Sequence, residues 1–521
     1  MRTIAGAVLF WVFLSAGCHS SSSPVREREL RINLGQNPAT LDPAKARDLN
    51  TLTLLRMLFE GLTRLSKEEK PELALAKEVS LSQDLKRYTF ALKESFWSEG
   101  TPLTAYDFVY AWRRALSPAF PSDYAAQLYV IKNGRAVKEG KLLQEELGVK
   151  ALDERTLQVD LERPAPYFLE LLSFPIFFPL LQSRQESYSR FVDHEDSLVG
   201  NGPFCLKRWK QDDSLLIEKN ERYWDSKSVK LKRVFFVMVD SETELALFEK
   251  GELDWAGSPL SSLPIDALKE LQKRGRVKQK TFCATSFVRL QTQKGPLAIP
   301  AFRRALSLAV NRKEIVEHVT CGGQLPSTTL VPPSFRLHPR ELFEDGATAQ
   351  AKELFKESQV RLTRPLTFLY CNGTRNHLIA QALQEQWRKA LGVLVRLEAA
   401  ERKIFFSRLS QGDFELALGD WVADFHDPVN FLEILKTKDA GTNRTGWENA
   451  LYTEMLERSF NIAASKERFS LLAEAEKILL DEMPLIPLNQ AAMLYLHQDK
   501  IKGVSISSMG NMELKWAYFD E

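Results

Sequence analysis

The segment from residue 366 to residue 397 constrains the fold of this chain more than any other. Leu366 to Cys371 and Val393 to Leu397 have the composition of strands, and Gly392 ends the segment between them. Within that segment apolar residues recur at helical spacing, at Leu378, Ile379, Leu383, Trp387 and Leu391. A strand, a helix and a strand in this order imply a right-handed crossover with parallel pairing. The chain is therefore predicted to be an α/β protein.

A later stretch, from Phe414 to Phe425, is expected to belong to the same sheet. Phe414 to Leu418 alternates apolar residues with others and then meets Gly419, which predicts a strand at the sheet edge that runs into a turn. Trp421 and Asp424 would follow the end of this strand. Ligands of open α/β sheets bind outside the carboxyl ends of the strands, so these two residues suggest an apolar contact beside an anchor for a cation. The alternative is a surface turn with a structural tryptophan.

A second block of the same kind begins near residue 231. Leu231 to Val239 is predicted to be a strand, and Ser241 to Glu244 forms a capping box that opens a helix. Gly251 ends this helix, and Leu253 to Ala256 is the next strand. At 521 residues the chain is too long for one core and is expected to divide into two or three domains. Two such blocks that face each other would enclose a cleft between lobes.

The N-terminus has the pattern of a bacterial export signal. An apolar run from Ile4 to Leu14 is too short to span a membrane but suits the core of a signal peptide, predicted over residues 1–17. Small residues directly before Cys18 resemble a lipobox, in which the cysteine is acylated, although Ser15 stands where leucine is usual. Residues 18–29 would then be a lipid-linked tether that anchors the protein to a membrane. The alternative is an ordinary signal peptide with an incidental cysteine.

Charge and motifs exclude several classes of function. The 70 basic and 68 acidic residues give a formal net charge of +2, so no nucleic acid partner is expected. The chain has no Gly-x-Ser-x-Gly, His-Glu-x-x-His or Gly-x-Gly-x-x-Gly motif, and its seven histidines are scattered, so catalysis, a metal site and a cofactor are not expected. Cys205, Cys283, Cys321 and Cys371 allow three complete disulfide connectivities, or none.

Seven blocks stand out along the chain: Leu41 to Pro43, Leu58 to Leu62, Trp97 to Phe108, Asn201 to Phe204, Gly251 to Asp254, Arg304 to Val310 and Trp421 to Asp424. In this order they resemble the periplasmic oligopeptide-binding proteins, the solute-binding components of peptide ABC importers in the larger peptide and nickel binding-protein family. The similarity covers nearly the whole mature chain. It implies a type II periplasmic-binding-protein-like fold, with two main lobes of mixed and parallel sheets, an inserted extra domain and hinge closure over a cleft.

The resemblance also implies the domain boundaries. Domain I is expected to be discontinuous, with residues 30–60, 190–283 and 504–521. Domain II would be inserted into it as residues 61–189. Domain III would be residues 284–503 and would anchor the ligand.

The same resemblance implies how a peptide is held at its amino end. An enclosed peptide adds a strand to the protein, so main-chain hydrogen bonds supply affinity without reading side chains. Asp424 matches the aspartate that pairs with the α-ammonium of the peptide, a group that is costly to enclose without a partner. The other contacts implied near this end are Trp421, Val422, Tyr124 from domain II, Leu49 from domain I, and Ser258.

At the carboxyl end of the ligand the chain departs from the family. His377 is kept, whereas Leu418 and Thr320 stand where relatives have arginine and lysine. Arg402 replaces a pocket tryptophan and is a candidate substitute cation. The resemblance therefore implies an altered ligand preference rather than a lost function.

Together these patterns predict a lipid-anchored protein of the periplasm or cell envelope that captures short peptides. Its further partners are expected to be the permease subunits of an ABC importer and, through the lipid, a membrane; the protein itself is expected to be a monomer. One alternative is the same fold dedicated to a murein peptide, a nickel chelate or haem. The other is a surface lipoprotein with an adhesion or signalling role.

Overall fold

The computed structural model describes residues 29–122, 124–184, 198–335, 337–339, 341–438, 441–463 and 465–520. The predicted signal peptide and Cys18 lie outside these residues. Among the helices of the described ranges, none is both long enough and apolar enough to cross a membrane. The four described cysteines are all free thiols.

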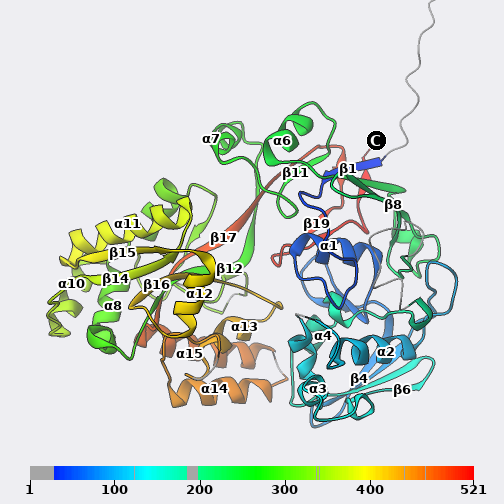
Figure 1. Ribbon diagram of the computed structural model, residues 1–521, viewed down its shortest axis with the longest axis horizontal. Helices are drawn as coiled ribbons and strands as arrows, with labels where there is room; N and C mark the ends of the chain where they lie inside the picture. Colours follow the sequence, from blue (N-terminus) through cyan, green and yellow to red (C-terminus); the bar gives the residue numbers. More distant parts are fainter. Residues whose placement is uncertain are drawn as a thin grey trace, which may run out of the picture.

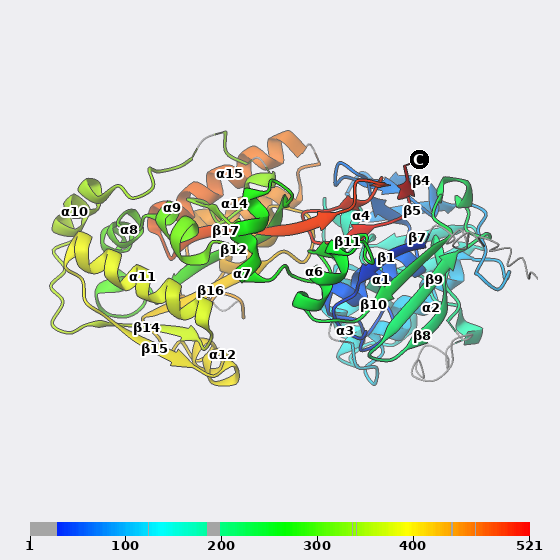
Figure 2. The ribbon, with the colours of Figure 1, turned by 90° about the horizontal axis from the view of Figure 1, so that it is seen from above.

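One eleven-stranded mixed sheet runs through the whole molecule (Figures 1 and 2). Its strands lie in the order β15, β14, β16, β12, β17, β11, β1, β10, β9 and β8, with β13 paired to β17. Their bounds are β1 (Glu29–Asn33), β8 (Phe204–Lys210), β9 (Ser214–Lys219), β10 (Arg233–Val237), β11 (Trp255–Gly257), β12 (Lys278–Leu290), β13 (Leu325–Pro326), β14 (Leu366–Cys371), β15 (Val395–Ala400), β16 (Leu416–Val422) and β17 (Leu485–His497).

Two lobes are joined by β12 and β17, which pair antiparallel and cross from one lobe to the other (Figure 1). We call residues 29–277 and 498–520 the first lobe and residues 291–484 the second lobe. The ladder between β12 and β17 shifts register between Thr281 and Thr285 and again between Ser286 and Phe287. These irregularities lie at the middle of the connection, where a sheet bends most easily. The predicted two-lobed α/β fold is confirmed.

In the first lobe, β1 pairs parallel with both β10 and β11, as the predicted crossover requires. The crossover helix is α6 (Ser241–Glu249), and the predicted capping box at Ser241 is wrong. Asp240 is the N-cap, because its backbone is still extended and its carboxylate accepts from the Thr243 N–H at 2.8 Å. Helix α1 (Leu49–Leu58) follows β1 and is capped in the same way by Asp48.

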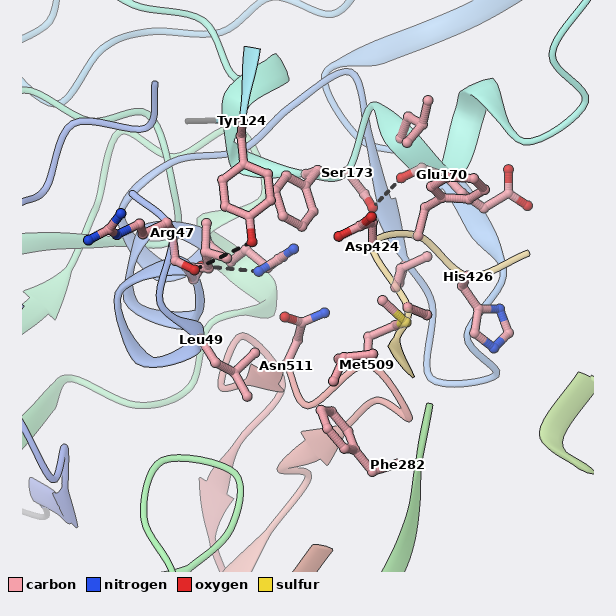
Figure 3. Close-up of a pocket in the computed structure, with 18 residues that line it drawn as sticks. Arg47, Leu49, Tyr124, Glu170, Ser173, Phe282, Asp424, His426, Met509 and Asn511 are labelled. Atoms are coloured by element: carbon pink, nitrogen blue, oxygen red, sulfur yellow. Dashed lines mark hydrogen bonds between the residues drawn. The ribbon is translucent and has the colours of Figure 1, made fainter. Parts of the chain in front are cut away.

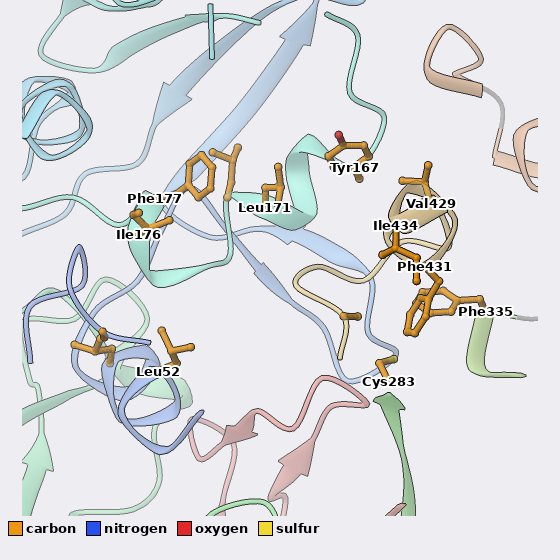
Figure 4. Close-up of a cluster of buried hydrophobic side chains, with 14 of the residues drawn as sticks. Leu52, Tyr167, Leu171, Ile176, Phe177, Cys283, Phe335, Val429, Phe431 and Ile434 are labelled. Atoms are coloured by element: carbon orange, nitrogen blue, oxygen red, sulfur yellow. The ribbon is translucent and has the colours of Figure 1, made fainter. Parts of the chain in front are cut away.

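A smaller antiparallel sheet in the first lobe has the order β4 (Ala76–Leu81), β5 (Arg87–Leu92), β7 (Thr156–Asp160) and β6 (Val149–Asp153). Helix α2 (Ala105–Leu116) packs on it through Phe108, Trp112 and Leu116, which are all fully buried. The Trp112 indole also donates to the Phe177 carbonyl at 3.0 Å. Figure 4 shows Phe177 among the apolar side chains that continue this core.

In the second lobe, β14 pairs parallel with both β15 and β16. Helix α11 (Thr374–Leu391) connects β14 to β15 and ends at Gly392 in the left-handed conformation (φ 69°), as predicted. The other α-helices with four or more residues in the described ranges are α3 (Gly134–Lys138), α4 (Phe168–Leu171), α7 (Ile265–Lys273), α8 (Pro300–Leu308), α10 (Thr348–Glu357), α12 (Arg402–Ser410), α13 (Val429–Leu432), α14 (Ala450–Phe460) and α15 (Ser465–Glu482).

The predicted end of the strand near Gly419 is wrong. β16 continues to Val422 because β12 pairs with it along its whole length, with Phe287 opposite Gly419 and Thr285 opposite Trp421. The strand is also interior to the sheet rather than at its edge. Trp421 therefore lies within β16, and Asp424 follows two residues after its end.

A buried ion pair fastens the loop after β1 to α2. Arg114 donates to both carboxylate oxygens of Asp42, at 2.6 and 3.1 Å, and the side chains are 7% and 0% exposed. We expect Asp42→Ala to lower the free energy of unfolding by about 3–5 kcal/mol, because it leaves a buried guanidinium unpaired. Asp160→Ala, whose partner Arg87 is 57% exposed, is the control and should change little. Urea denaturation of both variants measures the difference, and equal losses would contradict the assignment.

Candidate ligand-binding site

A cavity of about 220 Å³ lies between the two lobes, with walls from both (Figure 3). The first lobe supplies the start of α1, the end of α4 with the residues after it, and the loop between β19 (Ser505–Ile506) and β20 (Met512–Glu513). The second lobe supplies residues 422–426, at the end of β16 and just after it. The cavity thus brings together segments that lie hundreds of residues apart.

The topology of the second lobe explains why the chain after β16 faces this cavity. From β14 the chain passes through α11 to β15 on one side, and then through α12 to β16 on the other side of β14. The order of the strands therefore reverses at β14. Ligands of open α/β sheets bind at such a reversal, outside the carboxyl ends of the strands. Asp424 lies at this position, and α11 and α12 begin there.

Part of β16 also has a free edge. β12 pairs with β16 from Leu416 to Val422, whereas β14 pairs only with Leu416 and Ala417. No other strand of the described residues pairs with 418–422 on that side. Main-chain N–H and C=O groups along this edge are available to an extended ligand that adds as a strand.

Asp424 is a half-buried carboxylate in the wall of the cavity (Figure 3). Its main-chain N–H donates to Asn430 Oδ1 at 3.2 Å, and the same oxygen accepts from the Trp421 indole at 2.9 Å. Burial raises the pKa of Asp424, and a side-chain hydrogen bond with Asn430 lowers it in part. Within the described part of the chain, Asp424 forms no ion pair. A desolvated carboxylate without a cation is prepared for a cationic ligand group.

The opposite wall contains Leu49 and Tyr124, as the resemblance implied. Leu49 is the first residue of α1, and the Tyr124 hydroxyl donates to the Arg47 carbonyl at 3.4 Å. The Tyr124 ring lies 5.4 Å from that of Phe174, and the guanidinium of Arg56 lies 5.4 Å from the same Phe174 ring. The rings of Tyr124 and Phe174 thus make this wall aromatic, and the guanidinium of Arg56 lies against the Phe174 ring.

Several cavity residues were not predicted from the sequence: Arg47, Arg56, Glu170, Ser173, Phe282, His426, Met509 and Asn511. Arg56 follows Leu49 and Leu52 at helical spacing on α1, so the face that these three share was a usable signal. Met509 and Asn511 come from the C-terminal loop, and no local pattern points to them.

Five predicted site residues lie outside this cavity. Trp421 holds the Asp424 loop through Asn430, and Leu418 is buried in β16. Ser258 accepts from the Trp255 indole at 2.9 Å through its carbonyl. His377 Nδ1 lies 2.6 Å from the Tyr370 hydroxyl, and Arg402 is exposed at the start of α12. Their roles in binding stay predictions.

The comparisons with known proteins agree on one protein family. A family model described as "Bacterial extracellular solute-binding proteins, family 5 Middle" matches residues 70–443. The chain is 37% identical to the oligopeptide-binding protein OppA of Bacillus subtilis, over 94% of this chain and 92% of that protein. It is 31% identical to the periplasmic murein peptide-binding protein MppA of Escherichia coli, over 92% of this chain and 91% of that protein.

Solved structures also indicate the arrangement of the lobes. The unliganded open form of MppA, 30% identical, superposes with a TM-score of 0.85 over 95% of this chain and 98% of that one. A second MppA structure from Escherichia coli, also 30% identical and covering 95% and 99%, reaches only 0.73. Peptide-bound OppA of Listeria monocytogenes, 28% identical and covering 95% and 100%, reaches 0.69. The lobes of this chain therefore stand as in an open form.

Glu170 provides a test of how the cavity wall is solvated. Burial raises the pKa of this carboxyl to about 7, and its Oε2 is buried without a hydrogen-bond partner among the described residues. Because the folded state holds the proton more tightly than the unfolded state, whose pKa is near 4.5, stability should fall as pH rises from about 4.5 to 7. We expect Glu170→Gln to abolish this loss, which is of the order of 3 kcal/mol.

Denaturation measured at pH 4.5 and pH 8 checks this expectation. Glu68→Gln, which removes an exposed carboxylate, is the control. If Glu170→Gln gave no stabilisation at pH 8 relative to pH 4.5, the carboxyl would have to be solvated.

Proposed function

Since this chain belongs to the bacterial extracellular solute-binding proteins of family 5, we propose that it captures short peptides in the cleft between its lobes and delivers them to an ABC importer. The observation that carries the proposal is Asp424, a desolvated carboxylate in the cleft wall without a cationic partner among the described residues. A peptide with a free amino end supplies that cation. The ion pair then forms in a setting from which closure excludes water.

The free edge of β16 supports the same reading. A peptide whose ammonium lies at Asp424 can run back along residues 422 to 418 and receive main-chain hydrogen bonds from the edge that β14 leaves open. Such bonds do not depend on the side chains of the ligand. The relatives OppA and DppE of Bacillus subtilis, named for oligopeptide and dipeptide binding, support a peptide ligand for this chain.

Binding is proposed to close the lobes by a bend in β12 and β17. The open arrangement resembles the unliganded form of MppA, while the structure of Haemophilus influenzae OppA in complex with RPPGFSPFR, 25% identical and covering 95% and 99%, superposes less well, at 0.72. The register shifts between β12 and β17 interrupt their pairing, and we propose that the two strands bend there. No catalytic role is proposed, since the family consists of solute-binding proteins.

We expect Asp424→Asn to weaken binding of peptides with a free amino end by tenfold or more, about 1.4 kcal/mol or more. N-acetylated peptides should bind the unmodified protein and this variant equally weakly. Asp266→Asn, an exposed acid on α7 of the first lobe, is the control and should bind like the unmodified protein. Calorimetric titration measures these affinities. If the unmodified protein bound acetylated and free peptides equally, Asp424 would not be the partner of the peptide ammonium.

The identity of the natural ligand is tested by native mass spectrometry of protein purified from its source. A ladder of short peptides supports general peptide import. A single defined mass supports a dedicated ligand such as a murein peptide, nickel chelate or haem. Protein that never carries or binds a small molecule would support an adhesion or signalling role instead.

We propose further that the mature chain is tethered to a bacterial membrane by lipid on Cys18, which lies outside the described residues. Cys18→Ser should move the protein from the membrane fraction to the soluble fraction and remove the mass of the acyl groups. Fractionation together with intact-mass measurement checks both effects. An unchanged distribution with an unchanged mass would show that the cysteine is incidental.

A further inference from the structure

Three arginines lie near one another on the second lobe and the adjoining end of β12, outside the cavity that contains Asp424. Arg402 begins α12, and its guanidinium carbon lies 5.3 Å from the centroid of the Phe406 ring. The guanidinium carbon of Arg444 lies 5.7 Å from the same ring. Arg289 of β12 lies 4.7 Å from the Phe287 ring and close enough to Arg444 for their charges to repel. We call these three residues the arginine cluster.

The positive charge of the arginine cluster is balanced only in part. Throughout the described ranges, none of its guanidinium groups forms an ion pair or a hydrogen bond. Burial and the charge of Arg444 lower the pKa of Arg289 to about 10, and Asp420 offsets this only in part. Burial also lowers the pKa of Arg444. Like charges held together and partly desolvated are stabilised when an anion enters between them.

The lack of a side chain at Gly419 leaves room for Arg289 of the arginine cluster. A Cβ atom at Gly419 would lie 1.7 Å from Arg289 Nη1, so any other residue there would displace the guanidinium. Gly419 belongs to the free edge of β16, and Phe406 beside the other two arginines is 41% exposed. The cluster therefore borders the edge along which an extended ligand is proposed to lie.

The spacing along β16 relates the arginine cluster to Asp424. Gly419 precedes Asp424 by five residues, which at the rise of a strand corresponds to roughly 16 Å. An extended peptide covers this distance with about four or five residues. A ligand whose ammonium lies at Asp424 thus brings its later residues to the cluster, on the side where Leu418 supplies no charge.

We propose that Arg289, Arg402 and Arg444 bind a carboxylate of the peptide ligand. The inference rests on the proposed peptide function and names the group that recognises the far end of the ligand. The carboxylate is either the α-carboxylate of a peptide of matching length or the side chain of an acidic residue near the fourth position. Guanidinium groups suit both, because each offers paired N–H donors to two oxygens.

Calorimetric titration with two sets of alanine peptides tests this proposal. The first set has three to six residues, each with a free or an amidated carboxyl end. The second set is amidated and carries one glutamate at each position from the second to the fifth, with glutamine as the neutral match. The proteins are the unmodified chain, Arg402→Gln/Arg444→Gln, and Lys403→Gln, which removes one positive charge from the next position of α12.

We expect the unmodified protein to prefer at least one carboxylate form over its neutral match by about tenfold or more. The double variant should lose that preference while it still binds the neutral peptides, and Lys403→Gln should keep it. In the first set, tighter binding of the free than of the amidated carboxyl end identifies the α-carboxylate as the bound group. In the second set, tighter binding of glutamate than of glutamine identifies a side-chain carboxylate. Peptide binding without any preference, or a preference that survives in the double variant, overturns this proposal alone. Failure of all peptides to bind overturns the proposed function with it.

Discussion

The pairing of β12 with β17 is the interaction on which the rest of the structure depends. Lys278 to Arg289 pairs with Leu485 to Tyr495, so the same two strands belong to the sheets of both lobes. A continuous ladder would hold the lobes rigidly, but its register shifts leave Phe282, Cys283 and Ala284 without partners on β17. Phe282 lines the cavity. The joint at which we propose that the lobes close is therefore also part of the cavity wall.

The lobes also touch each other directly, and these contacts restrict how they can move. The Tyr167 ring of the first lobe stacks on Phe425 of the second at 4.4 Å, and Arg163 pairs with Glu433 at 3.1 Å. Phe425 follows Asp424 directly, so this contact and the proposed ammonium anchor are on one loop. A rotation of the lobes that preserved the stack would swing the remainder of the cleft shut around it. The proposed position of the ligand's amino end would thus be coupled to the geometry of closure through adjacent residues.

Local features could be predicted from the sequence more accurately than features that depend on long-range contacts. The bounds of β14 and the end of α11 at Gly392 were predicted correctly, because a strand pattern and a left-handed glycine are local signals. β16 was ended too early, because the pairing that extends it past Gly419 comes from β12, more than a hundred residues away. Leu49, Val422, Tyr124 and Asp424 were placed together only through the resemblance. Residues such as Asn511 carry no pattern that foretells their position.

The proposed role of the arginine cluster also explains how ligand binding can be kept when one cation is missing. Leu418 is apolar and buried, so it supplies no cation at the position for which the resemblance implies arginine. Arg289, Arg402 and Arg444 come from a strand, a helix and a loop, and only the fold brings them together beside Gly419. Between Gly419 and Asp424 the chain is paired with β12 as far as Val422. Where both proposed sites act on one ligand, this length of backbone sets the distance between them, and the two charged groups of the ligand must match that distance.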